Sequence, residues 1–176
     1  IAAHLASNQA ANRNLLGDLS ATVRPPDADT GSARALEAAV EALAAAEDTE
    51  YGGFGGAPKF PPSPLLRFLL AHAHSGSPTA GTAAALAERT LTAMALGGIY
   101  DQVGGGFARY AVDRRWQVPH FEKMLYDNAQ LLRIYAHFSR LAEDTDVKAL
   151  ALRVTHGTAR WMAAELAVPG GAFASS

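Results

Sequence analysis

The 176-residue sequence contains no cysteine. This absence excludes disulfide bonds, thiolate nucleophiles and cysteine-ligated zinc within the chain. An excess of charge of one sign is also missing, because 15 basic and 17 acidic residues leave a formal net charge of −2. A nearly balanced charge provides no general attraction to nucleic acid or to an anionic membrane.

Long apolar runs are absent as well. No stretch of the chain approaches the roughly 18 consecutive apolar residues of a membrane-spanning helix. The first 16 residues also lack the basic start and apolar block of a signal peptide. We therefore expect a cytoplasmic protein. Because the chain begins at Ile1 and ends in the turn-like residues 170–176, we expect it to be a piece of a longer product, cut at both ends.

Helical patterns dominate what is present. Apolar side chains at three- and four-residue intervals predict six helices, over about 2–19, 32–47, 63–75, 78–97, 121–142 and 145–166. Ser63-Pro64 and Ser77-Pro78 are typical of helix starts, and Gly97-Gly98 favours a left-handed cap at a helix end. Short strands at about 107–112 and 115–118 predict a small β-hairpin between helices. We expect one all-α domain, in which residues 1–29 form a leading helix and a linker.

A loose internal repeat supports an arrangement of helical hairpins. Gly52-Gly53-Phe54, Gly105-Gly106-Phe107 and Gly170-Gly171-Ala172-Phe173 each follow a helical stretch, at intervals of one hairpin plus a long loop. Loops at such a spacing are expected to gather on one face of a ring or solenoid.

The densest candidate region combines the glycine-rich segment 97–106 with the segment 119–127. Five glycines in ten positions indicate positive φ angles or a close backbone approach, whereas the plainer interpretation is a tight crossing from a helix to a hairpin. The segment lacks the glycine spacing and the preceding strand of a nucleotide-binding fingerprint.

Four residues here are candidates for acid–base catalysis: Asp101, His120, Glu122 and Asp127. His120 and Glu122 are expected at a helix entrance, where free N–H groups and the helix dipole favour anions. On spacing alone the alternative is a solvated helix face on which Lys123 and Asp127 form an i,i+4 ion pair.

Aromatic and cationic residues near the glycine-containing loops are candidates for substrate binding. Aromatic rings in loops suit sugar stacking, but they also serve to plug a loop onto a core. Lys59 lies in a stiff proline-containing segment that would place a cation at a pocket rim or simply connect two hairpins. The full set is Lys59, Phe60, Tyr100, Arg109, Tyr110, Trp116, Lys123 and Tyr126. No histidine spacing supports a metal site, and no cofactor site is indicated.

Two long motifs resemble a known family. The segments 51–61 and 97–113, with 116–127, are similar to the thioredoxin-domain-containing proteins related to spermatogenesis-associated protein 20 and bacterial YyaL. The resemblance implies a thioredoxin-like domain with a Cys-x-x-Cys pair, followed by an (α/α)6 toroid of the six-hairpin glycosidase type. This chain has neither cysteine nor a βαβ pattern, so the resemblance makes it about the first half of the toroid, without the redox domain.

Two functions follow as expectations. The first is a carbohydrate-type pocket that acts as a glycoside hydrolase or sugar epimerase, in which this chain alone would be inactive. The second is a non-catalytic binding or scaffold module that serves the attached redox domain. The two functions differ in what they require of Asp101, His120, Glu122 and Lys123. In a catalytic pocket these side chains would point into an open concavity, whereas in a scaffold they would be paired with each other and with the backbone. Expected partners are a carbohydrate or other small molecule, the missing parts of the parent chain, and a second copy covering truncated helix faces, but neither nucleic acid nor membrane.

Overall fold

The computed structural model describes residues 30–176, so the predicted helix over 2–19 and its linker lie outside the described residues. The elements are α2 (Thr30–Ala46), α3 (Ser63–His72), α4 (Ala80–Leu96), α5 (Leu125–Leu141), α6 (Thr145–Trp161), the π-helix η1 (Met162–Leu166), β1 (Ala167–Val168) and β2 (Ala172–Phe173). The chain divides into two units, 1–36 and 37–176. The second unit holds every element from α3 onward.

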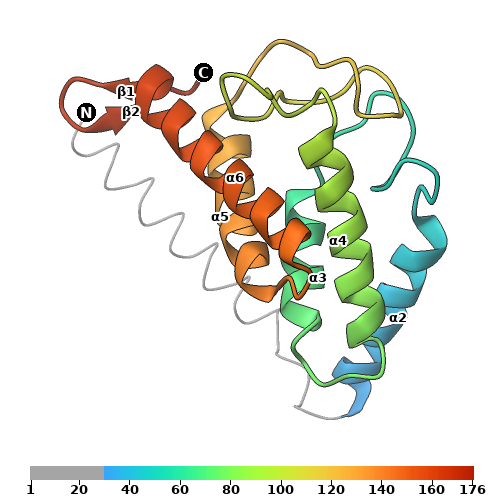
Figure 1. Ribbon diagram of the computed structural model, residues 1–176. Coiled ribbons are helices and arrows are strands. Elements are labelled where there is room, and N and C mark those ends of the chain that lie inside the picture. Colours follow the sequence, from blue (N-terminus) through green and yellow to red (C-terminus); the bar gives the residue numbers. More distant parts are fainter. Residues whose placement is uncertain (1–29) are drawn as a thin grey trace, which may run out of the picture. The chain divides into compact units, whose positions relative to one another are not determined.

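The helices of this unit form antiparallel hairpins. α3 packs on α4 and α5 packs on α6, through the short connections 73–79 and 142–144. α3 also packs on α5, and α4 on α6, which gives two layers. The long connections 47–62 and 97–124 lie together at the opposite end, where α5 begins and α6 ends (Figure 1). We call this end of the helices the loop end. The arrangement confirms the predicted all-α fold of helical hairpins.

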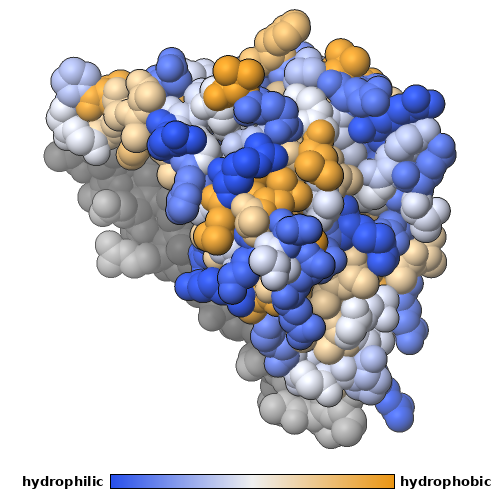
Figure 2. Space-filling model, in the orientation of Figure 1, coloured by the Kyte–Doolittle hydropathy of each residue, from blue (hydrophilic) through white to orange (hydrophobic). Residues whose placement is uncertain are grey.

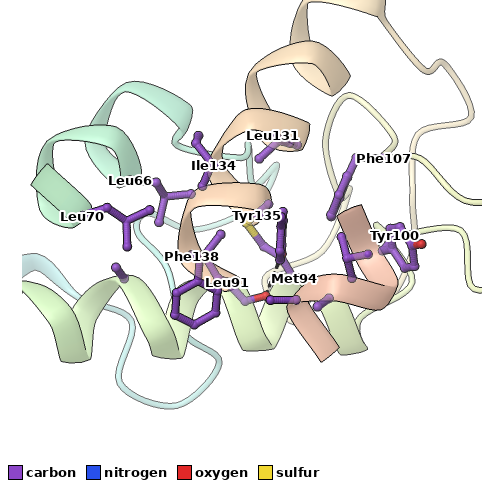
Figure 3. Close-up of a cluster of buried hydrophobic side chains, with 14 of the residues drawn as sticks. Leu66, Leu70, Leu91, Met94, Tyr100, Phe107, Leu131, Ile134, Tyr135 and Phe138 are labelled. Carbon is purple, nitrogen blue, oxygen red and sulfur yellow. Dashed lines mark hydrogen bonds between the residues drawn. The ribbon is translucent and has the colours of Figure 1, made fainter. Parts of the chain in front are cut away.

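The core lies between the two layers (Figure 3). Leu66 of α3, Leu91 of α4 and Leu131 of α5 are fully buried in it. Tyr135 is also buried, and its hydroxyl donates a 2.7 Å hydrogen bond to the carbonyl oxygen of Leu91. Since a buried phenol needs a partner for its O–H group, this bond fixes the distance between α5 and α4 at the centre of the core.

Helix α5 begins at Leu125, four residues later than the sequence predicts. The backbone N–H of Arg109 donates to the carbonyl of Glu122, and the N–H of His120 donates to the carbonyl of Tyr110. Because segment 120–122 pairs with segment 109–110 in this way, it cannot also enter the helix. The prediction that His120 and Glu122 stand at a helix entrance is therefore wrong.

Three further boundaries differ. α3 ends at His72, about three residues before its predicted end. α4 begins at Ala80, because the Ser77 hydroxyl accepts from the N–H of Thr79 before the helix starts. The predicted helix 145–166 changes to π-helical geometry after Trp161, and β1 and β2 follow where no strand is predicted.

Within residues 30–176, none of the helices combines the length and apolar character that crossing a membrane requires.

The predicted hairpin over 107–118 pairs only through isolated bridges. Ala111 bridges to Pro119 on one side and to Lys59 on the other, and the N–H of Val112 donates to the carbonyl of Val118. The turn is built on Asp113, whose carboxylate accepts backbone N–H groups of the residues after it. These local bonds compete with a regular ladder, so the segments pair without forming strands.

The glycine-rich segment has both the positive φ angles and the close backbone approach that its composition indicates. Gly105 and Gly106 have φ angles of 82° and 78°. Gly97 instead has a φ of −77°, so the predicted left-handed cap is wrong there. A Cβ atom on Gly97 would lie 2.7 Å from the carbonyl oxygen of Trp116, and one on Gly98 would overlap the carbonyl of Gln117. These two glycines are needed because segment 116–117 passes directly over the end of α4.

Candidate functional site

Three neighbouring rings lie at the loop end, where Phe60 is tilted by 35° against Tyr110 and Tyr110 stacks on His120; we call them the ring stack. The centroids of Phe60 and Tyr110 are 4.8 Å apart, and those of Tyr110 and His120 are 4.5 Å apart with 22° between the ring planes. Phe60 is 51% exposed, so the stack reaches the surface. On the face drawn in Figure 2, hydrophobic patches also come to the surface at the loop end, between hydrophilic side chains. The stack can therefore offer a ring face to a ligand.

Charged residues accompany the stack. The guanidinium of Arg109 donates to Glu122 at 3.2 Å, and both side chains are partly exposed. Asp127 lies in the first turn of α5. Burial raises the pKa of Asp127, and the charge of Glu122 adds to this rise, while Arg109 opposes it. The hydrogen bond to Glu122 raises the pKa of Arg109, and the half-exposed Tyr126 adds to this rise.

His120 and Asp127 each have a buried polar atom without a partner. Among the described residues, Nδ1 of His120 and Oδ2 of Asp127 are two of only four such side-chain atoms, and the other two are threonine hydroxyls. Buried polar groups are nearly always hydrogen-bonded, because leaving one unpaired costs about 1–3 kcal/mol. Both groups are of a type that can carry a proton, and within the described residues neither atom has a hydrogen-bond partner.

Asp101 and Lys123, by contrast, are paired. Lys123 Nζ donates to Asp101 Oδ2 and to the carbonyl of Gly105, both at 2.8 Å, and lies 4.9 Å from the centre of the Trp161 ring. The Lys123 ammonium, with backbone N–H groups, lowers the pKa of Asp101 to about 2. Asp101 therefore stays ionised at neutral pH. The pair lines a cavity of about 440 Å³ together with Trp161 and Glu165.

Lys59 is not presented at a rim, contrary to the prediction, because it is 1% exposed. Its ammonium donates to Asp48 at 2.7 Å, to the carbonyl of Gly52 at 2.6 Å and to that of Arg114 at 3.1 Å. These three bonds use all three ammonium hydrogens, so no donor is left for a substrate. Lys59 holds loops 47–62 and 97–124 together.

Trp116 and Tyr100 are buried as well, and neither offers a stacking surface. The Trp116 indole N–H donates to the carbonyl of Gly52 at 3.1 Å, and its φ of 64° lies in the left-handed region. Tyr100 packs against Phe107 with 4.9 Å between ring centroids. These two rings pack the loops onto the core, which is the alternative to sugar stacking.

Asp48 is the charged residue that sequence reasoning missed. It accepts hydrogen bonds from Lys59 and, through both oxygens, from Arg114 at 2.7 and 2.8 Å. Burial alone would raise the pKa of Asp48, but the bonds from Arg114 and Lys59 outweigh it and hold that pKa far below its usual range. No local pattern could have singled out Asp48, because Arg114 is 66 residues away.

The site residues thus fall into four groups. Phe60, Tyr110 and His120 form the ring stack, and Arg109, Glu122, Tyr126 and Asp127 interact electrostatically with one another. Asp101 and Lys123 line the cavity beside Trp161, and Lys59, Tyr100 and Trp116 are structural. Over residues 30–176, no group of three or more histidine, aspartate or glutamate side chains is placed to hold a metal ion.

Comparison with known proteins places these features in a family. The chain is 44% identical over 122 residues to spermatogenesis-associated protein 20 of Rattus norvegicus, an alignment covering 68% of this chain and 15% of the relative. It is 41% identical over 154 residues to the protein of that name from Homo sapiens, an alignment that covers 86% of this chain and 19% of the relative. The chain therefore spans less than a fifth of the length of these relatives. No protein-family model matches it.

The fold is similar to a solved enzyme. Cellobiose 2-epimerase from Spirochaeta thermophila, an (α/α)6 toroid, superposes with a TM-score of 0.54 over 85% of this chain and 41% of that one. Sequence identity in the superposition is 16%, so the likeness concerns the fold. The described helices correspond to part of such a toroid.

Proposed function

Because this chain belongs to the family of spermatogenesis-associated protein 20, we propose that its loop end is one wall of a carbohydrate-type pocket in which His120 and Asp127 transfer protons. The similarity of the fold to a sugar epimerase supports the ligand class. The observation that carries the proposal is that Nδ1 of His120, whose ring stacks on Tyr110, and Oδ2 of Asp127 are both buried without partners.

Each residue has a distinct role in this pocket. The faces of Phe60 and Tyr110 pack against the C–H groups of a sugar ring, and the Arg109 guanidinium donates to its hydroxyl oxygens. The raised pKa of Asp127 brings this carboxyl closer to the range in which it can hold and release a proton. His120 supplies the second proton-transfer group, while the ionised Asp101 only orients Lys123.

The proposal is tested with cellobiose and the full-length protein in D2O. Inversion at the carbon next to the aldehyde requires that a base remove its proton and that an acid return one, so the proton NMR signal of that carbon would decline with time. His120→Ala and Asp127→Asn should each slow this exchange at least 100-fold, in line with the usual contribution of acid–base catalysis. Asp146→Asn, which alters an exposed carboxylate on α6, is the matched control and should leave the rate unchanged.

A second function is favoured by the closed ion pairs. Asp101 with Lys123 and Arg109 with Glu122 are already satisfied within the chain, as in a module that binds without catalysis. Here the pocket would present a small molecule to a thioredoxin-like domain of the parent protein. Calorimetric binding of cellobiose that persists in His120→Ala and Asp127→Asn, with no exchange in D2O, would favour this function.

A cytoplasmic location stays a prediction.

A further inference from the structure

A second cavity, of about 330 Å³, lies between α3 and α5. None of the residues proposed for the sugar pocket lines it. Its charged and titratable lining consists of Arg67 from α3 and Arg133, His137 and Arg140 from α5, and its remaining lining is apolar. We call this cavity the basic groove.

The three α5 residues share one face of the helix. They are spaced four and three residues apart, the intervals at which helical side chains become neighbours and like charges repel. Among the described residues, no carboxylate lines the groove. In the part of the chain that the structure describes, Arg67, Arg133 and Arg140 take part in no ion pair. Within residues 30–176, this local concentration of positive charge therefore has no ion-paired counterion.

The pKa of His137 responds to the positive charges of the groove. The His137 ring stacks against that of His74, which does not line the groove, with 6.4 Å between centroids. Burial lowers the pKa of His137, and the charges of Arg140, His74 and Arg133 lower it further. Several positive groups therefore act on one partly buried ring, which indicates that their charges converge on the groove.

We propose that the basic groove binds a small molecule that carries a phosphate group. Three arginines provide three positive charges, which a single carboxylate would leave largely uncompensated and which a phosphate monoester or diphosphate balances more closely. The planar guanidinium donors match phosphate oxygens in pairs. The volume lies within the usual range of small-ligand pockets, and the apolar lining suits the organic part of the ligand.

The test is calorimetric titration of the full-length protein with pyrophosphate at constant ionic strength set by chloride. We expect saturable binding that inorganic phosphate displaces. The double variant Arg67→Gln/Arg133→Gln should weaken pyrophosphate binding at least tenfold, and Arg140→Gln alone should weaken it measurably. Lys148→Gln, which removes one positive charge from an exposed position on α6, should leave it unchanged.

Three results would overturn the proposal. The first is a wild-type protein that shows no saturable heat with pyrophosphate, as would occur if an acidic segment of the full-length protein filled the groove. The second is an equal loss of affinity in Lys148→Gln, which would reveal a general field effect. The third is unchanged binding in both groove variants. Circular dichroism of each variant confirms that a loss of binding does not arise from unfolding.

Discussion

Replacing Asp48 by asparagine gives the sharpest test of how the loop end is held together. The substitution keeps the size and one acceptor of the side chain but removes the charge that faces Lys59 and Arg114. The Asp48 and Lys59 side chains are 3% and 0% exposed, so the ammonium would remain buried beside a neutral partner. Breaking a buried ion pair from one side costs about 3–5 kcal/mol.

The magnitude should fall at the lower end of that range. Lys59 keeps its bonds to the carbonyls of Gly52 and Arg114, so its ammonium does not lose every partner. We therefore expect Asp48→Asn to lower the free energy of unfolding by about 3 kcal/mol at pH 7. Urea unfolding followed by far-UV circular dichroism measures this loss. Tryptophan fluorescence also reports on the loop end, because the Trp116 ring lies 4.9 Å from Lys59 Nζ and the Trp161 ring lies 4.9 Å from Lys123 Nζ.

A double-mutant cycle and the pH dependence complete the test. Lys59→Met removes the buried cation, so Asp48→Asn/Lys59→Met should cost less than the sum of the two single substitutions. The folded-state pKa of Asp48 is depressed, so its stabilising contribution is present above the unfolded pKa of about 3.9 and is lost as the pH falls below it. The difference in unfolding free energy between wild type and Asp48→Asn should therefore begin to shrink below about pH 5 and continue to shrink as the pH falls further toward the folded-state pKa. Additive costs, or a loss under about 1 kcal/mol at pH 7, would refute the reasoning.

Three further predictions concern the same end of the molecule. Gly98→Ala should destabilise the chain by about 1–3 kcal/mol, because its methyl group meets backbone, whereas Gly56→Ala, in open space, should change stability by less than about 0.5 kcal/mol in the same urea assay. In Lys123→Met the pKa of Asp101, followed by carboxyl carbon NMR, should rise from about 2 toward about 3.9, and a value that stays near 2 would show that backbone N–H groups alone set it. We propose that a second copy covers apolar helix surface such as Leu152 of α6, which is 39% exposed, so light scattering of this chain should give a dimer mass, and a monodisperse monomer at high concentration would contradict this.

Much of the site lies where sequence alone could locate it. The two glycine-containing motifs and the segment 119–127 do meet at one end of the helices, because antiparallel hairpins place alternate connections together. Phe60, Tyr110 and His120 come from these segments and stack. The role of individual side chains could not be predicted in this way, because a loop lysine or tryptophan has the same local pattern whether it is buried or exposed.

The sequence by itself determined the helical periodicity, the hairpin order and the family likeness, since these depend on residues close together in the chain or on whole motifs. Only the tertiary structure decided that Lys59 faces Asp48 and Arg114, that segment 120–122 pairs with 109–110 instead of starting α5, and that His120 and Asp127 keep unpaired atoms. Each of these depends on contacts between distant segments, and burial then fixes which charges must be satisfied inside the chain and which stay open to a ligand.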